Sequence, residues 1–360
     1  MKQDRLDNVL HQMKEKNVPQ LLISDPTTIF YLTDKWFHPG ERLLVLVIRE
    51  DGKHALVLNK LFPVNEDLGV DVVYVDDADN GIGILLDHLD TAKKIGVDKF
   101  WATHFFLDLM KQAGKSADDF VIGSDITDYV RARKTAEEVK LMQDAQKDNE
   151  IAMEKMKQLI PQKLTEMEMT KELAKVYDEL GNTGFSFEPI IAYGANGADP
   201  HHVTDDSVVK EGDSIVVDIG AIKNNYASDM TRTFFYKSVS DKSRDVYETV
   251  LEANKRALAA IKPGVPFSEI DAAARDYITE KGYGKYFTHR TGHFIGIECH
   301  EAGDVSSANH DVVEPGMAFS IEPGIYLPGE VGVRIEDLVI ATEDGYINLN
   351  DYPKELTIID

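Results

Sequence analysis

The sequence has little sulfur chemistry and no long apolar run. Cys299 is the only cysteine among 360 residues, which excludes an internal disulfide and predicts a protein of the reducing cytoplasm. No stretch of about 18 uncharged apolar residues occurs, so we predict that no segment spans a membrane. The first 17 residues are rich in charge and predict an amphipathic helix rather than a signal peptide.

Positive charge is also scarce. The chain has 39 Lys and Arg against 63 Asp and Glu, which gives a formal net charge of −24. Nucleic-acid binding needs a basic face, and an anionic membrane surface would repel this chain, so we predict neither partner. A dinucleotide-binding glycine loop is absent as well. Gly81 and Gly83 do not match that fingerprint, and we predict that they lie at the start of a helix.

A chain of this length predicts two domains. Short apolar strands alternate with helices up to about residue 125, which predicts an N-terminal α/β domain at 1–125. Residues 126–160 carry apolar side chains at three- and four-residue steps and predict a linker helix, with Thr135 and Glu138 as a capping box. Residues 161–360 predict a second domain, in which helices cover a curved antiparallel sheet. The fold class is therefore predicted as α+β.

A pair of aspartates is predicted to face each other in residues 216–235. This segment has the pattern of two apolar strands around a turn at 223–225. Folding the hairpin on that turn places Asp218 opposite Asp229. Cross-strand partners lie about 5 Å apart, and like charges there repel, so a cation between the carboxylates would reverse the sign of the effect.

A pair of glutamates is predicted in the same arrangement in residues 321–339. A turn centred on Gly329 would place Glu322 opposite Glu336, and His293 lies in the segment between the two hairpins. One acidic pair alone is more often a solvated sheet edge. Two pairs embedded in apolar strands, together with a histidine, favour a site for two divalent first-row metal ions.

The order of these five residues resembles that of the pita-bread metallopeptidases, which include methionine aminopeptidase, aminopeptidase P and prolidase. The local matches are long: DIG...YASDMTRTF, HRTGHFIGIECHE, SIEPGIYLPG and GVRIEDLV. The resemblance covers residues 160–360 strongly and the N-terminal part more loosely. It implies a C-terminal pita-bread domain and a smaller N-terminal creatinase-like α/β domain. The nearest likeness is to the bacterial Xaa-Pro dipeptidases (prolidases).

The resemblance also implies how the metal ions are held. Asp218 would bind one ion, Asp229 and Glu336 would bridge the two, and His293 and Glu322 would complete the other. A water shared by two such ions loses a proton near neutral pH and serves as the nucleophile. Oxygen-rich ligation favours manganese, with cobalt or zinc as alternatives.

Four residues are predicted to take part in catalysis, and for one of them the sequence offers an alternative. By resemblance, Glu322 would accept the proton of the attacking water. His201 and His300 would contact the substrate carbonyl or the developing oxyanion. His202 is adjacent to His201, and the sequence leaves the choice between them open. Arg334 stands two residues before Glu336 and should project to the same face, where it would orient carboxylates or bind a substrate terminus; a surface ion pair is the plainer alternative.

The side chains around the predicted ligands receive simpler assignments. Thr231 and Tyr226 are predicted donors to the ligand carboxylates. His300 lies seven positions after His293, an odd spacing that requires a bend or bulge, which Gly296 permits. Strand alternation points Cys299 away from the pocket, so we predict a packed thiol and not a nucleophile.

The substrate predicted by the resemblance is a dipeptide with proline second. His289 and Arg290 are candidate substrate contacts, and so are His38 and Arg42 in the loop WFHPGER. In related dimers an N-terminal loop reaches the partner's active site, so we predict a homodimer with a composite pocket. Asp304 stands where some relatives have an arginine, which leaves recognition of the free carboxylate open. The alternatives are an aminopeptidase P that acts on longer peptides and a non-catalytic binding protein.

Overall fold

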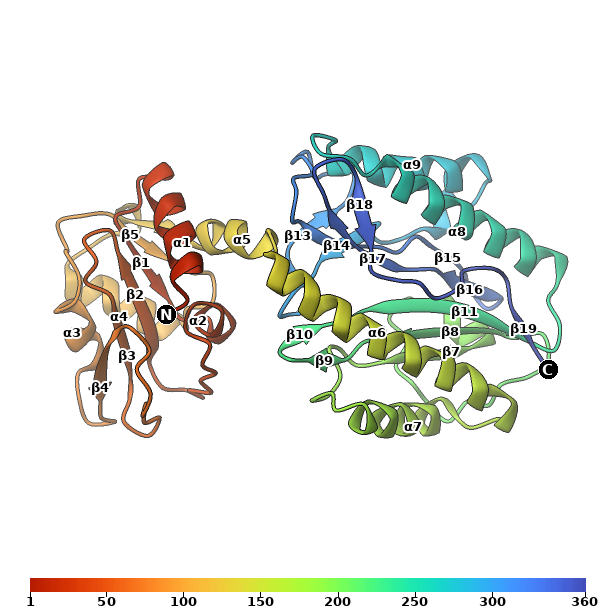
Figure 1. The fold of residues 1–360 in the computed structure, drawn as a ribbon, viewed down its shortest axis with the longest axis horizontal. Coiled ribbons are helices and arrows are strands. Elements are labelled where there is room, and N and C mark those ends of the chain that lie inside the picture. The colour runs from red at the N-terminus through yellow and green to blue at the C-terminus, as the bar shows by residue number, and fades with distance from the viewer. The chain divides into compact units, whose positions relative to one another are not determined.

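The structure, a computed structural model, describes all 360 residues (Figure 1). The chain divides into two compact units, Met1–Arg131 and Ala132–Asp360. The predicted linker range 126–160 holds most of α5 (Ser124–Ala132) and the long helix α6 (Ala136–Leu159). None of the helices combines the length and apolarity that a membrane crossing requires. Helices and mostly antiparallel sheets confirm the predicted α+β class.

The N-terminal unit is built on one mixed six-stranded sheet in the order β4-β3-β2-β1-β5-β6. Its core consists of apolar side chains of these strands and of α3 and α4, such as Val45, Val57 and Leu109. The strands are β1 (Gln20–Ile23), β2 (Leu44–Arg49), β3 (Ala55–Asn59), β4 (Asp71–Val75), β5 (Ile95–Val97) and β6 (Phe120–Ile122). The helices are α1 (Gln3–Glu15), α2 (Pro26–Thr33), α3 (Gly81–Leu86), α4 (Thr103–Ala113) and α5.

The first half of the C-terminal unit packs two helices on a four-stranded sheet. Helix α6 begins at the predicted capping box, because the Thr135 hydroxyl accepts from Glu138 N and the Glu138 carboxylate accepts from Thr135 N. Met153, Leu173 and Ile215 belong to the buried cluster between helices and strands. The elements are α6, α7 (Glu166–Glu179), β7 (Ile190–Tyr193), β8 (Ser214–Ile219), β11 (Met230–Tyr236) and β19 (Ile358–Ile359), with the short pair β9 (Ile222–Lys223) and β10 (Tyr226–Ala227).

The second half repeats this plan with two more helices. Figure 1 shows α8 and α9 along one side of the strands and α6 and α7 along the other. Val250, Phe267 and Phe319 lie in the apolar cluster that joins α8 and α9 to their sheet. The elements are α8 (Asp241–Ala260), α9 (Phe267–Glu280), β12 (Gly292–Phe294), β13 (Glu301–Val305), β14 (Ala318–Ile321), β17 (Asp337–Ala341) and β18 (Tyr346–Asn348), with the hairpin β15 (Gly324–Leu327) and β16 (Val331–Arg334).

The register predicted for the aspartate hairpin is wrong by two residues. Asp218 pairs with Thr231, and not with Asp229. The turn consists of Asn224 and Asn225 alone, which have φ angles of 49° and 66°. Two positive φ angles are typical of the two-residue turn that matches the twist of a hairpin. Asp229 lies two residues before Thr231, so the two aspartates are diagonal neighbours that can still lie on one face of the sheet.

The register predicted for the glutamate hairpin is confirmed. Gly329 has a φ of 74° at the turn between β15 and β16. The β15–β16 ladder and the β14–β17 ladder share one register, in which Ile321 pairs with Asp337. Glu322 and Glu336 lie between these two ladders and therefore face each other, as predicted.

Candidate active site

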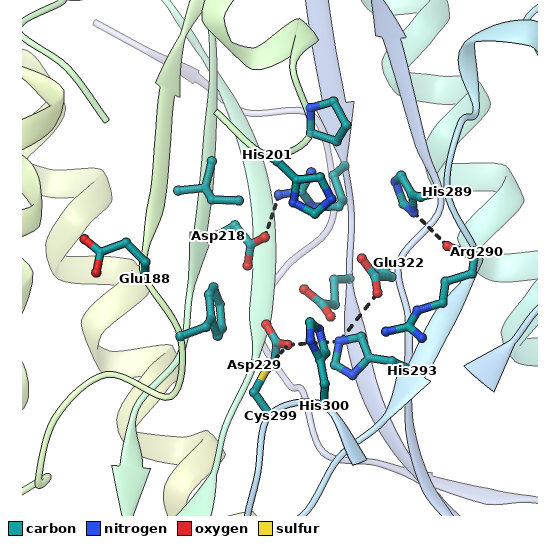
Figure 2. A pocket seen from close by; sticks show the side chains of 15 residues that line it. Glu188, His201, Asp218, Asp229, His289, Arg290, His293, Cys299, His300 and Glu322 are labelled. Atoms are coloured by element: carbon teal, nitrogen blue, oxygen red, sulfur yellow. Dashed lines mark hydrogen bonds and ion pairs between the residues drawn. The ribbon is translucent and has the colours of Figure 1, made fainter. Parts of the chain in front are cut away.

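Ten of the predicted site residues line one cavity. Its volume is about 560 Å³, and it lies in the C-terminal unit. Figure 2 shows carboxylates from the first half and imidazoles from the second half pointing toward one another. The ten residues are Asp218, Asp229, His293, Glu322, Glu336, His201, His300, Arg334, His289 and Arg290.

The five predicted metal ligands converge from both halves of the unit. His293 Nε2 lies 3.3 Å from Asp229 Oδ2 and 3.5 Å from Glu322 Oε1. Asp229, His293 and Glu336 each offer an atom within 4.8 Å of the other two. His293 Nδ1 is 3.2 Å from the Phe294 carbonyl oxygen, which can only accept, so this nitrogen carries the proton. Nε2 is thereby left free toward the carboxylates, as in a metal-binding histidine.

Three buried carboxylate oxygens at this point have no hydrogen-bond partner. They are Asp218 Oδ1, Asp229 Oδ1 and Glu336 Oε1. A buried charge without a partner is costly, and most buried polar atoms in proteins are hydrogen-bonded. Divalent cations would satisfy all three oxygens at once, and oxygen with imidazole nitrogen is a donor set that such ions accept. The residues present therefore fit a pair of metal ions.

Burial and crowding raise the pKa values of the carboxylates. Burial raises the pKa of Asp218 to about 6; the Arg334 charge opposes this, and the Asp229 charge adds to it. Burial likewise raises the pKa of Glu322 to about 7. The pKa of Glu336 lies well above its usual range because of burial and the nearby Asp229 charge. These groups repel one another when ionised, and a bound cation would remove that repulsion.

Arg334 orients two of the carboxylates, Asp218 by direct contact and Glu336 through Thr231. The side chain is only 3% exposed, so the surface ion pair considered from the sequence is wrong. Its Nη2 lies 2.5 Å from Asp218 Oδ2, and its Nε donates to Thr231 Oγ1 at 3.1 Å. The Thr231 hydroxyl donates to Glu336 Oε2 at 2.9 Å, which confirms the contact predicted for Thr231. The single proton of the Tyr226 hydroxyl is donated to Glu138 at 2.8 Å, so this hydroxyl is not the predicted donor to a ligand carboxylate.

A chain of hydrogen bonds leads from Arg334 to His289. Arg334 Nη1 donates to the Tyr326 hydroxyl at 2.8 Å, and that hydroxyl lies 2.8 Å from His289 Nε2. His289 Nδ1 lies 2.7 Å from the Arg290 carbonyl oxygen and must donate to it. The Tyr326 hydroxyl therefore donates to His289 Nε2. Burial and the Arg334 charge lower the pKa of His289 to about 3, so the imidazole is neutral near pH 7.

The predicted bend between His293 and His300 is confirmed. The register of β12 against β13 shifts between His293 and Phe294, and residues 296–300 form no strand. The two imidazole rings meet edge to face with centroids 4.2 Å apart. Burial, with a smaller contribution from the neighbouring His293, lowers the pKa of His300 to about 4.

The prediction that Cys299 points away from the pocket is wrong. Its side chain lines the cavity, and its thiol lies 3.3 Å from Asp229 Oδ2. Strand alternation does not apply here, because the bend that brings His300 to the cavity turns Cys299 inward as well. Burial and the Asp229 charge raise the pKa of the thiol well above its usual range, which makes it a poor nucleophile.

The structure separates the two adjacent histidines that the sequence left open. His201 lines the cavity. His202 Nε2 lies 2.7 Å from the buried carboxylate of Glu166. The sequence carries no mark of this difference, because Glu166 lies far from the pair along the chain.

Two predicted substrate contacts lie in the N-terminal unit and remain predictions. His38 stacks on Trp36 with ring centroids 6.3 Å apart. Arg42 is paired with Asp77 and with Glu41, each at 2.9 Å.

Several residues of the site were missed from the sequence. Tyr326, which contacts Arg334 and His289, could have been found, because it lies four positions after Glu322 in the hairpin and even spacing along a strand places side chains on one face. Phe187, Glu188 and Ile190 also line the cavity, at or just before the start of β7. They carry no signal of their own in the sequence.

Comparison with known proteins identifies the class to which this site belongs. Residues 140–343 match the model of metallopeptidase family M24, and residues 5–133 match the creatinase/prolidase N-terminal domain. The chain therefore belongs to metallopeptidase family M24 and carries the pita-bread fold behind a creatinase-type N-terminal domain.

Individual relatives match almost the whole chain. An uncharacterised peptidase of Staphylococcus aureus (strain MRSA252) is 32% identical over 356 residues, which cover 97% of this chain and 99% of that protein. The structure of the dipeptidase PepE from Mycobacterium ulcerans is 32% identical with a TM-score of 0.93, and covers 99% of this chain and 97% of its own. The structure of an Xaa-Pro dipeptidase from Bacillus anthracis is 31% identical with a TM-score of 0.90, and covers 99% of each chain.

Proposed function

We propose that this protein hydrolyses Xaa-Pro dipeptides with the help of two divalent metal ions. The observation that carries the proposal is the set of three buried carboxylate oxygens without a hydrogen-bond partner, on residues that line the same cavity as His293. The similar structures from M. ulcerans and B. anthracis are described as dipeptidases. Manganese suits the oxygen-rich ligands best, with cobalt and zinc as alternatives.

All five ligands have a place in this proposal. Asp218 would hold one ion, His293 and Glu322 would hold the other, and Asp229 and Glu336 would serve both. A pair of bound ions supplies a water of lowered pKa and polarises the scissile carbonyl.

Glu322 is the group that accepts the proton of the attacking water. Its carboxylate lines the cavity, and its Oε1 receives a hydrogen bond from the Ser320 hydroxyl at 3.2 Å. This contact holds Oε1 of Glu322 in place. A general base must lie within hydrogen-bond reach of the proton that it removes.

The imidazoles of His201 and His300 bind the substrate carbonyl and the oxyanion that develops from it. Both line the cavity, and the low pKa of His300 keeps that ring neutral near pH 7, so that one nitrogen donates a hydrogen bond. Donors fixed in advance at the position of developing charge stabilise the transition state.

The free carboxylate of a dipeptide needs a cation. Arg334 is paired with Asp218, whereas Arg290 lines the same cavity and makes no ion pair. We assign Arg290 to the substrate carboxylate, with His289 beside it. In a homodimer, His38 and Arg42 of a second copy would complete the pocket.

The discriminating experiment compares two substrates. The protein is stripped with EDTA, reloaded with manganese, cobalt or zinc, and supplied with Leu-Pro or Leu-Pro-Gly. Release of proline from Leu-Pro alone supports the proposal. Cleavage of Leu-Pro-Gly alone would make the protein an aminopeptidase P, and cleavage of neither would leave a non-catalytic binding protein.

Two arginine variants test how the carboxylate is recognised. Arg290→Gln should raise KM for Leu-Pro at least about tenfold, because a charged hydrogen bond contributes roughly 1.5–3 kcal/mol. Arg42→Ala should raise KM as well if the pocket is shared between two copies. An unchanged KM in Arg42→Ala would remove the N-terminal loop from the site.

A further inference from the structure

A second polar cluster lies outside the metal ligands, at the start of α7. Glu166 is the first residue of this helix and is fully buried. One of its carboxylate oxygens accepts from Tyr193 N at 2.8 Å and from Asn196 Nδ2 at 3.0 Å. The other accepts from Asp205 N at 3.0 Å and lies 2.7 Å from His202 Nε2. Four donors thus meet one buried carboxylate.

This cluster is not a further metal site. Glu166, His202 and Asp205 do gather ligand-type atoms within 4.8 Å of one another. Both oxygens of Glu166 are already occupied by protein donors, in contrast to the unpartnered oxygens of the cavity. A carboxylate that accepts several N–H groups is satisfied without a cation.

The four donors come from both ends of the loop that carries His201. Tyr193 ends β7, and Asp205 lies beyond His201 in the chain. The backbone of α7 adds to the attachment, because Glu166 N donates to the Ser207 carbonyl and Met167 N donates to the Asp205 carbonyl, each at 3.1 Å. Between these attachments the loop has one short 3-10 turn and no strand. The first turn of α7 therefore holds the part of the loop that carries His201.

We propose that Glu166 is a positioning residue that holds the loop of residues 194–207 so that His201 faces the reacting atoms. The two adjacent histidines have different roles. The imidazole of His202 contacts Glu166 and anchors the loop, and the side chain of His201 lines the cavity. This inference rests on the proposed function of His201 as a group that contacts the substrate. It assigns a role to a residue that touches neither metal nor substrate.

The chemistry of the contact requires a carboxylate. Glutamine in place of Glu166 keeps one acceptor oxygen and presents an amide NH2 in place of the other. That NH2 would face either two N–H donors or one N–H and the histidine. Buried donors that face each other lose their hydrogen bonds, and the loop must move to satisfy them.

The first test is a double-mutant cycle on Leu-Pro hydrolysis. Glu166→Gln should lower kcat about tenfold or more, because a small displacement of a group at a reacting centre is costly. It should change KM little. In the His201→Ala background the same substitution should have no further effect on kcat, since the residue acts only through His201. Equal effects in both backgrounds would overturn the proposal.

Glu168→Gln provides the matched control. Glu168 lies on the same turn of α7, is exposed, and accepts from Thr165 N at 2.9 Å without touching the loop. This substitution removes the same charge from the same helix end and should leave kcat within about twofold. A loss of kcat equal to that of Glu166→Gln would show a general effect of the helix end and overturn the proposal.

A second readout does not depend on catalysis. Amide hydrogen exchange of residues 194–207 in the metal-free protein should accelerate in Glu166→Gln and stay unchanged in Glu168→Gln. If the wild-type protein hydrolyses no dipeptide, the proposed function fails, and this measurement still decides whether Glu166 holds the loop. Should Glu166→Gln fail to fold, His202→Gln removes a single anchor and should show the same local acceleration. Unchanged exchange of this loop would overturn the proposal.

Discussion

At the scale of single residues, the cavity combines groups that are unfavourable alone. Asp218, Glu322 and Glu336 have raised pKa values because they are buried together. Arg334 offsets part of this cost through its ion pair with Asp218. Removing one partner of a buried pair is expensive, because the other charge is left without compensation.

Replacing Arg334 should therefore reduce stability and activity together. Arg334→Gln should lower the free energy of unfolding of the metal-free protein by about 3–5 kcal/mol, the range for breaking a buried ion pair. Urea denaturation in EDTA measures this change. Arg334→Lys keeps the positive charge but not the forked geometry of the guanidinium. Its free energy of unfolding should therefore lie between those of the wild type and Arg334→Gln. A loss below about 1 kcal/mol in Arg334→Gln would contradict a buried pair.

His289 should make stability depend on pH. Its pKa of about 3 in the folded protein lies below the ordinary histidine value of 6.5, so the unfolded chain binds a proton first as the pH falls. The contribution of the neutral His289 imidazole to the free energy of unfolding is therefore complete above pH 6.5 and is lost as the pH falls toward 3. Relative to His289→Gln, the metal-free wild type should lose up to about 1.4 kcal/mol for each pH unit below about 6. Urea titrations at pH 7, 6, 5 and 4 test this, and a constant difference would refute a buried neutral imidazole.

The residues that belong to the site could be predicted from the sequence where the alternating pattern of a strand determines which way a side chain points. Alternation places Arg334 on the face of Glu336, and the five predicted metal ligands, which follow from two hairpins and a histidine, line one cavity. Cys299 and His202 could not be placed in this way. The first depends on a bend, and the second on a buried partner far away in the chain.

At the scale of elements, two hairpins and one bulged strand set the site. The single glycine turn at Gly329 made the register of the second hairpin predictable from the sequence. The first hairpin contains Asn224 and Asn225, and two turn positions one residue apart give strand registers that differ by two. Which of them forms is decided by the backbone conformation of these asparagines, which the letters alone do not fix.

Close packing of two strands fixes His293. A Cβ on Gly292 would lie 1.9 Å from the Ser320 carbonyl oxygen, so β12 could not keep its distance from β14. Gly292→Ala should therefore move His293, lower metal affinity at least about tenfold and destabilise the fold by roughly 1–3 kcal/mol. Calorimetric metal titration and urea denaturation measure both.

Gly345→Ala is the control for that experiment. A Cβ on Gly345 meets no atom within 4 Å, and this glycine has no positive φ. Its metal affinity and stability should stay close to those of the wild type. Equal metal affinity in the Gly292 and Gly345 variants would contradict the argument that strand contact positions His293.

At the scale of the whole molecule, the site depends on both halves of the C-terminal unit. Asp218 and Asp229 come from the sheet under α6 and α7, and His293, Glu322 and Glu336 come from the sheet under α8 and α9. The sequence could predict the α+β class and the ligand types. It could not predict their distances, because these follow from how two separate sheets pack.

The same dependence couples metal binding to the folding of this unit. Ions that bind only the folded protein stabilise it in proportion to their affinity and concentration. The metal-free site leaves three buried oxygens without partners, so loading should give a large stabilisation.

Metal titration of the EDTA-treated protein is the most direct test of the central claim. Isothermal calorimetry with manganese should show two ions per chain. Asp229→Asn should weaken both, because that carboxylate would serve both ions, whereas Glu168→Gln should change neither. The account would be contradicted if the wild type bound no ion, or if Asp229→Asn bound manganese with the same affinity as the wild type.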